Sequence, residues 1–159
     1  MYIRKMKLED ISKVREIAYK VYEVTYEHII PRTIQENFLQ LVYAPKRLEQ
    51  RMSQSHFYIV EVQDEIIGFS SFSHVDTEGN CELLAMYLLE QYQGQKIGSL
   101  LLRRAINDMN GLCSITMNME ADNVNGIKFG LANNFCSVEL YLDDFEGLKL
   151  LTNRMKLII

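Results

Sequence analysis

An apolar strand that runs through a short polar loop into an amphipathic helix constrains this 159-residue chain more than any other feature. The stretch extends from Glu82 to Ile106, and its loop contains Gly94 and Gly98. Backbone N–H groups in the first turn of a helix have no partner within the helix, and the helix dipole adds partial positive charge at the same end. The sequence therefore predicts an anion cradle, suited to a diphosphate, that needs no basic side chain.

The flanking patterns favour this interpretation over an ordinary strand-to-helix turn, which stays open as the alternative. Residues 82 to 88 are apolar on both alternating faces, as in a strand covered on both sides. In the helix, apolar residues recur every four positions and polar residues form a second stripe. The apolar set is Ile97, Leu101, Ala105 and Met109, and the polar set is Ser99, Arg103 and Asn107.

The loop resembles the pyrophosphate-binding motif of the GNAT superfamily of N-acetyltransferases, which reads Gln/Arg-x-x-Gly-x-Gly/Ala after a strand. Gln93 and Gly98 match its ends, whereas Lys96 stands in place of the middle glycine. The resemblance implies that main-chain N–H groups of the loop hold the diphosphate of acetyl-CoA. Lys96 can still donate its amide if its backbone angles suit a residue with a Cβ, and its ammonium either assists the phosphates or is simply solvated.

The resemblance also implies a set of acetyl-CoA-binding residues. Main-chain N–H groups at residues 86 to 88 would polarise the thioester carbonyl, because a neighbouring strand splays away there and leaves donors unpaired. Asn123 would contact the cofactor, cap a helix, or do both. The implied set is Met86, Tyr87, Leu88, Gln93, Gly94, Gln95, Lys96, Ile97, Gly98, Ser99, Asn123 and Phe129.

A second stretch, residues 119 to 135, resembles the family segment Asn-x-x-Ala-x-x-Phe-Tyr-x-x-x-Gly-Phe. Its tyrosine is proposed in many members to protonate the departing thiolate, and Gly130 occupies that position here. Losing a general acid costs roughly 100-fold to 10,000-fold in rate but leaves the contribution of proximity intact. Asn123, Phe129 and Phe135 match the pattern, whereas Gly126, Gly130 and Asn134 replace its alanine, tyrosine and glycine.

Acetyl transfer needs a proton acceptor for the amine and a donor for the sulfur. Glu82 occupies the place where many family members carry a base, with solvent exposure at a strand end as the alternative; Glu120 and Asp122 are weaker candidates. Tyr141 is the predicted replacement acid. Tyr87 and Tyr92 are alternatives to it. All three tyrosines could instead be half-buried packing residues without a catalytic role.

Tyrosines at helical spacing in the first helix, beside Glu23 and Glu27, would bind an aromatic or cationic acceptor, or would form a packed stripe with a solvated acidic flank. They are Tyr19, Tyr22 and Tyr26. This stretch, together with Ile30 to Thr33 and the segment from Asp143 to Met155, resembles bacterial members that acetylate polyamines or free amines. The expected partner is therefore a small-molecule or peptide amine.

Composition limits the remaining function classes. A net charge of -4 without a basic run argues against nucleic acid. No signal peptide and no bilayer-length apolar run is visible, so we expect a cytoplasmic protein with no membrane partner. Cys81, Cys113 and Cys136 lack metal-ligand spacing and are expected to be free buried thiols, with no metal site. The sequence chooses no oligomeric state, and a homodimer is one option.

The periodicities predict one domain, residues 1–159, of the α/β (α+β) class. The predicted order, β-α-α-β-β-β-α-β-α-β-β, is similar to that of the acetyltransferase fold, and the resemblance implies a GNAT-type mixed, mostly antiparallel sheet of about six to seven strands flanked by helices. Thr33 and Glu36 match a capping box. Strands are expected at 2–5, 56–62, 66–73, 82–88, 113–119, 135–142 and 150–159, and helices at 8–26, 33–41, 45–53, 97–109 and 123–132, with a turn at 143–147.

The favoured function is an acetyl-CoA-dependent N-acetyltransferase that uses direct attack by the amine in a ternary complex. The departures from the family pattern at Lys96, Gly126, Gly130 and Asn134 support the alternative of a CoA-binding or regulatory domain with impaired catalysis. A third alternative places a longer acyl chain in the space vacated at Gly130.

Overall fold

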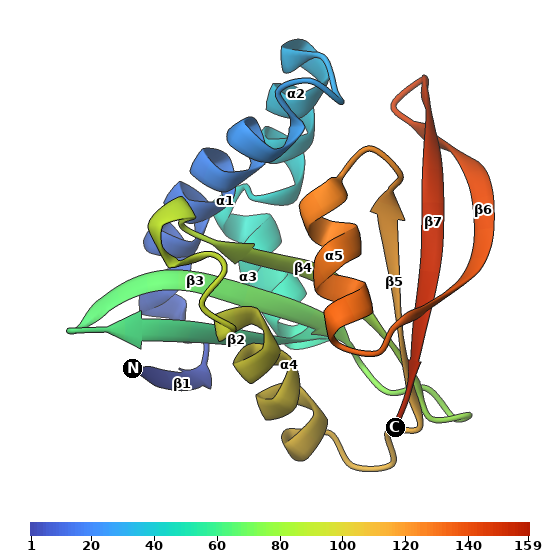
Figure 1. The fold of residues 1–159 in the computed structure, drawn as a ribbon. Coiled ribbons are helices and arrows are strands. Elements are labelled where there is room, and N and C mark those ends of the chain that lie inside the picture. The colour runs from blue at the N-terminus through green and yellow to red at the C-terminus, as the bar shows by residue number, and fades with distance from the viewer.

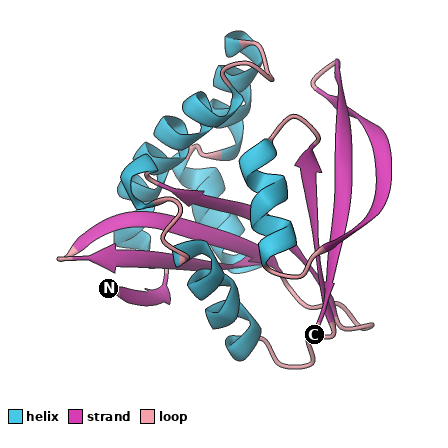
Figure 2. Cartoon of the chain, viewed as in Figure 1, coloured by secondary structure: helices cyan, strands magenta, loops and turns pink.

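A seven-stranded mixed sheet organises the protein, whose structure, a computed structural model, describes residues 1–159 (Figure 1 and Figure 2). The strand order is β1-β2-β3-β4-β5-β7-β6, and every neighbouring pair is antiparallel except β4 and β5. This confirms the predicted fold class, although three α-helices, and not the two of the predicted order, lie between β1 and β2. The strands are β1 (Tyr2–Lys5), β2 (Ser55–Val62), β3 (Glu65–Ser73), β4 (Asn80–Leu88), β5 (Ser114–Glu120), β6 (Cys136–Phe145) and β7 (Leu148–Ile158).

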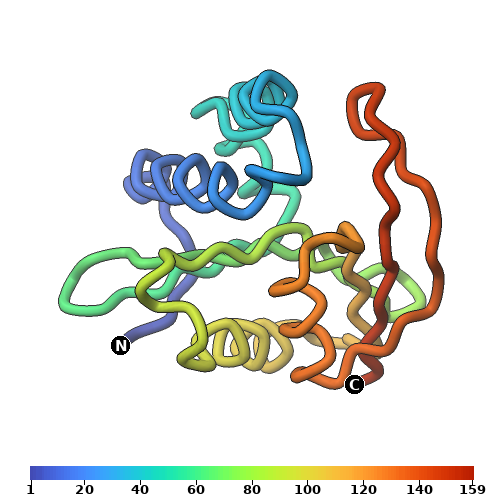
Figure 3. The backbone as a smooth tube through the Cα atoms, turned by 45° about the horizontal axis from the view of Figure 1, so that its top comes forward, coloured from blue at the N-terminus to red at the C-terminus, as the bar shows by residue number.

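Helices cover both faces of the sheet, with α1, α2 and α3 on one side and α4 and α5 on the other (Figure 3). Each side has its own core cluster of 15 buried residues, so the sheet separates two cores. None of the helices combines the length and apolar content needed to cross a bilayer. The helices are α1 (Ile11–Tyr26), α2 (Arg32–Val42), α3 (Pro45–Gln54), α4 (Ile97–Asp108) and α5 (Val124–Ala132), with short 3-10 turns η1 (Leu8–Asp10) and η2 (Glu90–Tyr92).

The parallel pair at the centre of the sheet is incomplete. β4 and β5 pair only from Asn80↔Ser114 to Glu82↔Thr116, after which the two strands diverge. A β-bulge at Leu84 accompanies the divergence, because Ser71 and Phe72 of β3 pair with residues 85 and 83. The far half of β4 therefore has a partner on one edge only.

Two local predictions are wrong. Thr33 does not cap α2, because the helix already begins at Arg32 with Pro31 before it, and Glu36 instead accepts a hydrogen bond from Arg32 Nε at 3.1 Å. Proline with its fixed φ is suited to a helix entry, so the helix starts one residue earlier than the capping box implies. The turn predicted at 143–147 is also too long, since β6 and β7 continue to within two residues of each other.

The prediction that the three cysteines are buried is confirmed only for Cys81. Cys81 is buried, whereas Cys113 and Cys136 are exposed, and all three are free. Cys136 lies at the start of the edge strand β6, where nothing covers the outer side. Apolar neighbours in the sequence did not indicate which side of that strand would be open.

Candidate active site

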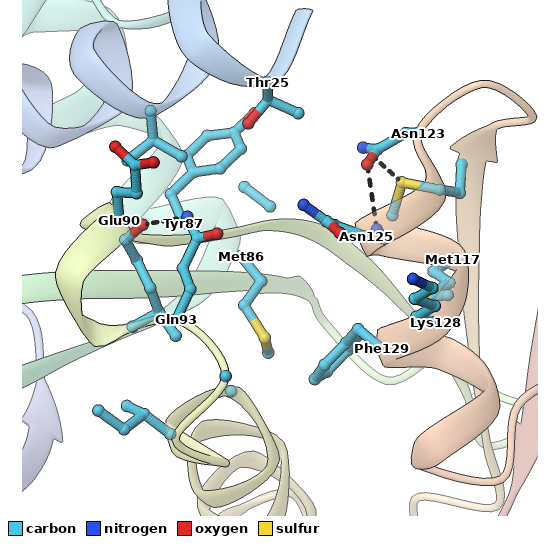
Figure 4. Close-up of a pocket in the computed structure, with 18 of the residues that line it drawn as sticks. Thr25, Met86, Tyr87, Glu90, Gln93, Met117, Asn123, Asn125, Lys128 and Phe129 are labelled. Carbon is cyan, nitrogen blue, oxygen red and sulfur yellow. Dashed lines mark hydrogen bonds between the residues drawn. The ribbon is translucent and has the colours of Figure 1, made fainter.

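The divergence of β4 and β5 opens a cleft of about 980 Å³ (Figure 4). Its walls come from the C-terminal half of α1, the far half of β4, the loop into α4, the end of β5, and α5. Eleven of the twelve predicted cofactor-binding residues line it; Gln95 does not, because its side-chain amide turns back to donate to the carbonyl of Gln91 at 2.8 Å. Two sequence motifs that lie 25 residues or more apart thus meet in one cleft.

Unpaired main-chain amides gather where the loop enters α4. The N–H groups of residues 94 to 99 donate to no acceptor in the protein, and the first amide bonded in this helix is that of Leu100, to the carbonyl of Lys96 at 3.2 Å. Gly94 has φ +73° and Lys96 has φ +62° and ψ +12°. Left-handed backbone costs a residue with a Cβ roughly 1–2 kcal/mol, so the middle motif position favours glycine although lysine adopts the required angles.

Close packing fixes this loop against its neighbours. Gln93 Nε2 donates to the carbonyl of Leu88 at 2.9 Å, which ties the loop to the end of β4. A Cβ on Gly98 would lie 3.0 Å from a ring carbon of Phe129 and 3.1 Å from the sulfur of Met86. Figure 4 shows Met86 and Phe129 pointing toward one another across the cleft. Glycine at position 98 therefore lets α4 approach both β4 and α5.

The exposed edge of β4 supplies a second group of free donors. The N–H of Leu89 donates to Ile67 of β3 at 3.0 Å, and Tyr87 is paired with Phe69. Because successive residues of a strand direct their main-chain groups to opposite edges, Met86 and Leu88 face the side that β5 has left. The geometry thus provides the donors expected at residues 86 to 88, except that the amide of Tyr87 faces β3.

Asn123 is the N-cap of α5. Its side-chain oxygen accepts from the N–H of Gly126 at 3.0 Å, and its amide nitrogen lies 3.1 Å from the sulfur of Met119. The capping interpretation is therefore confirmed, and the residue also lines the cleft. Asn134, which replaces the glycine of the family pattern, adopts φ +65°, the left-handed conformation expected of that glycine.

Methionine side chains fill the space left by the two glycines of α5. A Cβ on Gly126 would overlap the sulfur of Met119, and a Cβ on Gly130 would overlap the terminal methyl of Met117 and lie 3.1 Å from Met155. The space beside Gly130 that a Cβ would enter is thus occupied by the end of the Met117 side chain. A longer acyl chain at this position would therefore require the Met117 side chain to move.

Glu82 and Tyr141 meet at one amide that the sequence analysis did not select. Asn118 Nδ2 donates to Glu82 Oε1 at 3.0 Å, and the hydroxyl of Tyr141 donates to Asn118 Oδ1 at 3.1 Å. Arg154 Nε donates to the same oxygen at 3.1 Å. Asn118 lines the cleft, whereas Glu82 and Tyr141 lie behind it. No local motif marks Asn118, because its role depends on strands that pair from distant parts of the chain.

The tyrosines of α1 are packed. Tyr22 and Tyr26 are buried with their ring centroids 4.3 Å apart, and burial raises the pKa of both. Glu23 and Glu27 are exposed, so a packed stripe with a solvated acidic flank describes this helix. Tyr26 has a further contact, because its hydroxyl donates to Glu120 Oε2 at 3.0 Å.

Comparison with known proteins places these features in a family. Residues 12–130 match the model of the acetyltransferase (GNAT) family. A spermidine N(1)-acetyltransferase of Thermoplasma acidophilum is 28% identical over 141 residues, covering 84% of this chain and 86% of that protein.

Two solved structures share the fold. The PaiA N-acetyltransferase of Thermoplasma acidophilum, in complex with coenzyme A, superposes with a TM-score of 0.84 at 23% identity and covers 99% of this chain and 98% of that one. The putative acetyltransferase yncA of Salmonella typhimurium, with acetyl-CoA, has a TM-score of 0.70 at 18% identity over 99% of this chain and 93% of its own. The chain therefore belongs to the acetyltransferase (GNAT) family.

Proposed function

We propose that the protein transfers the acetyl group of acetyl-CoA to a primary amine. The observation that carries this proposal is that one cleft brings together the unpaired amides of Gly94 and of residues 96 to 99 with the free main-chain edge of β4. The family match supports the reaction type. The relative that is named a spermidine acetyltransferase supports an amine acceptor.

The cleft fits acetyl-CoA at two places. Amides at the start of α4 are suited to a diphosphate, because they are donors at the positive end of a helix dipole. The N–H groups of Met86 and Leu88 would stabilise the negative charge that develops on the acetyl oxygen during attack. The co-substrate supplies the acetyl group as a reactive thioester.

The amine attacks directly within a ternary complex in this proposal. Glu82 and Tyr141 stay predictions as base and acid. Their shared contact with Asn118 holds both side chains at the same point behind the cleft, which supports a role for the pair. The Tyr141 hydroxyl already donates to Asn118, so it would have to turn to reach a leaving sulfur.

A thiol-release assay tests the activity. The protein is incubated with acetyl-CoA and separately with spermidine, n-butylamine and a peptide with a free amino terminus, and free thiol and product mass are measured. We expect acetylated amine in equal amount to free thiol for at least one acceptor. Thiol release without acetylated amine, which indicates hydrolysis, would contradict the proposed function. So would a lack of thiol release with every acceptor.

A CoA-binding domain without turnover is the second candidate. The filling of the family tyrosine's place by Met117 favours it, because a general acid is missing from that position. In that case CoA at 100 times its dissociation constant would still stabilise the protein by about 2.7 kcal/mol. Thermal stabilisation by CoA without thiol release would select this candidate.

A further inference from the structure

Glu120, the last residue of β5, is a half-buried carboxylate without a cationic partner. It takes part in none of the ion pairs of the protein. Removing a carboxylate from water without a positive charge nearby is costly, so such a group needs an explanation. Perturbed carboxylates beside a cleft are frequently functional.

Tyr26 connects Glu120 to the cleft. Its hydroxyl donates to Glu120 Oε2 at 3.0 Å, and no other side chain donates to this carboxylate. The same tyrosine lines the cleft beside Thr25, which Figure 4 shows next to Tyr87. The carboxylate thus lies directly behind a wall residue of the cleft and is held in one orientation by it.

The groups around Glu120 carry no positive charge. Tyr26 of α1 contacts it, and Tyr22 of α1, Tyr87 of β4 and Asp143 of β6 are other titratable groups that interact with its charge. Burial, with a smaller contribution from the charge of Asp143, raises the pKa of Glu120 above its ordinary value. A carboxylate in this setting is well suited to receive a cation.

Position along the split separates Glu120 from the other candidate base. Glu82 lies where β4 and β5 are still paired, opposite Thr116. Glu120 lies four residues beyond Thr116, where the two strands have separated and β5 pairs only with β7. Tyr26 lines the cleft and Glu120 does not, so an acceptor that enters between the separated strands would meet Tyr26, with Glu120 directly behind it, without displacing strand pairs.

We propose that Glu120, oriented by Tyr26, receives the ammonium group of a primary alkyl amine and accepts its proton. This assignment rests on the proposed function and identifies where the acceptor amine binds in the cleft. Glu120 then acts as the catalytic base in place of Glu82.

The step balances with one proton released overall. The ammonium gives a proton to the Glu120 carboxylate, and the neutral nitrogen attacks the acetyl carbon, so that a C–N bond forms. The C–S bond then breaks, the sulfur leaves with the bonding electron pair, and the second proton of the nitrogen passes to the thiolate to give the thiol. Glu120 returns its proton to solvent.

Glu120→Gln and Tyr26→Phe test the assignment through the pH dependence of kcat/KM with spermidine. For Glu120→Gln we expect kcat/KM to fall about 100-fold or more. The fall of kcat/KM toward low pH, the acidic limb of the profile, should disappear, because protonation of this carboxylate causes it. For Tyr26→Phe the acidic limb should move to higher pH, because the lost hydroxyl stabilised the charged carboxylate. Glu36→Gln, an exposed carboxylate of α2, is the matched control and should leave the profile unchanged.

An acidic limb that persists in Glu120→Gln and disappears in Glu82→Gln would overturn the assignment. Calorimetric titration of n-butylamine into the CoA-saturated protein adds a measurement that needs no turnover. We expect Glu120→Gln to weaken binding at least tenfold relative to Glu36→Gln, and equal binding would overturn the proposal. Absence of thiol release in the unmutated protein would instead contradict the proposed function, and the titration would still decide whether Glu120 receives the ammonium group.

Discussion

The two ends of the cleft present different chemical groups, main-chain amides at one end and side chains at the other. At the α4 end, the proposed binding groups are the unpaired main-chain amides of residues 94 to 99, so most side chains there should be nearly free to vary. At the β5 end, the proposed groups are side chains: Tyr26 and Asn118 line the cleft, and Glu120 lies behind Tyr26. Tyr26 and Glu120 share one hydrogen bond, and Asn118 makes three. A lysine can therefore replace a motif glycine at the α4 end. At the β5 end, replacing a single carboxylate or hydroxyl oxygen should impair function.

This contrast predicts opposite responses to substitution. The main-chain end should fail only when the backbone is displaced or a side chain enters the space of the ligand. The side-chain end should fail when a single carboxylate or hydroxyl is removed, with little effect on folding. The variants below test the contrast from the largest expected effect to the smallest.

Gly68→Ala should cause the largest loss, because it displaces the strand that directs the free amides. A Cβ at this position would overlap the side chain of Leu88 and lie 2.6 Å from the carbonyl oxygen of Tyr87. Overpacking against backbone costs about 3 kcal/mol in unfolding free energy. Chemical denaturation measures it, and Gly147→Ala, with φ +85° and open space around its Cβ position, should lose only about 1 kcal/mol.

Gly98→Val should weaken CoA binding about 100-fold. The new side chain would meet Phe129 and Met86 and hold the ligand away from the amides, and hydrogen bonds to a charged group are worth about 1.5–3 kcal/mol each. Isothermal titration calorimetry checks this against Ser99→Ala, whose amide is unchanged. Binding by Gly98→Val as tight as that of the control would show that the diphosphate does not lie at the start of α4.

Glu120→Gln should stabilise the fold at neutral and higher pH. Since the pKa of Glu120 is raised in the folded state, the folded protein binds more protons than the unfolded chain, and stability falls as pH rises from the unfolded to the folded pKa. The neutral amide avoids that loss. The Tm at pH 8 should therefore rise, and the gain should vanish below the unfolded pKa. A lower Tm at pH 8 would indicate a structural carboxylate.

Lys96→Gly should change CoA affinity least, by less than about threefold, because the residue contributes its amide. Relief of the left-handed backbone should raise stability by about 1 kcal/mol. Calorimetry with CoA and thermal unfolding measure the two effects. A large fall in affinity would show that the ammonium, and not only the amide, holds the phosphates.

The sequence was informative where function depends on local backbone. The strand-loop-helix unit, the parallel neighbour strand and the cap at Asn123 all follow from short-range periodicity or spacing, and the structure contains each of them. The capping box at Thr33 failed because a proline next to it began the helix first. Local signals compete within a few residues, and a single preference does not decide which one prevails.

The acceptor end was less predictable because its residues meet only through tertiary structure. Tyr26 and Glu120 are separated by 94 positions, and their hydrogen bond depends on how α1 crosses the end of β5. Asn118 joins Glu82 and Tyr141 from three different strands. The filling of the Gly130 position by Met117 likewise required knowledge of which side chains face α5.

Backbone amide resonances give the most direct test of the claim that main-chain donors hold the co-substrate. Two-dimensional 1H–15N spectra would be recorded while CoA is titrated into the 15N-labelled protein. The largest shifts are predicted for residues 94 to 99, followed by Met86 and Leu88, at the positions of the unpaired donors. Saturable binding with these resonances unmoved, or no binding, would contradict the claim.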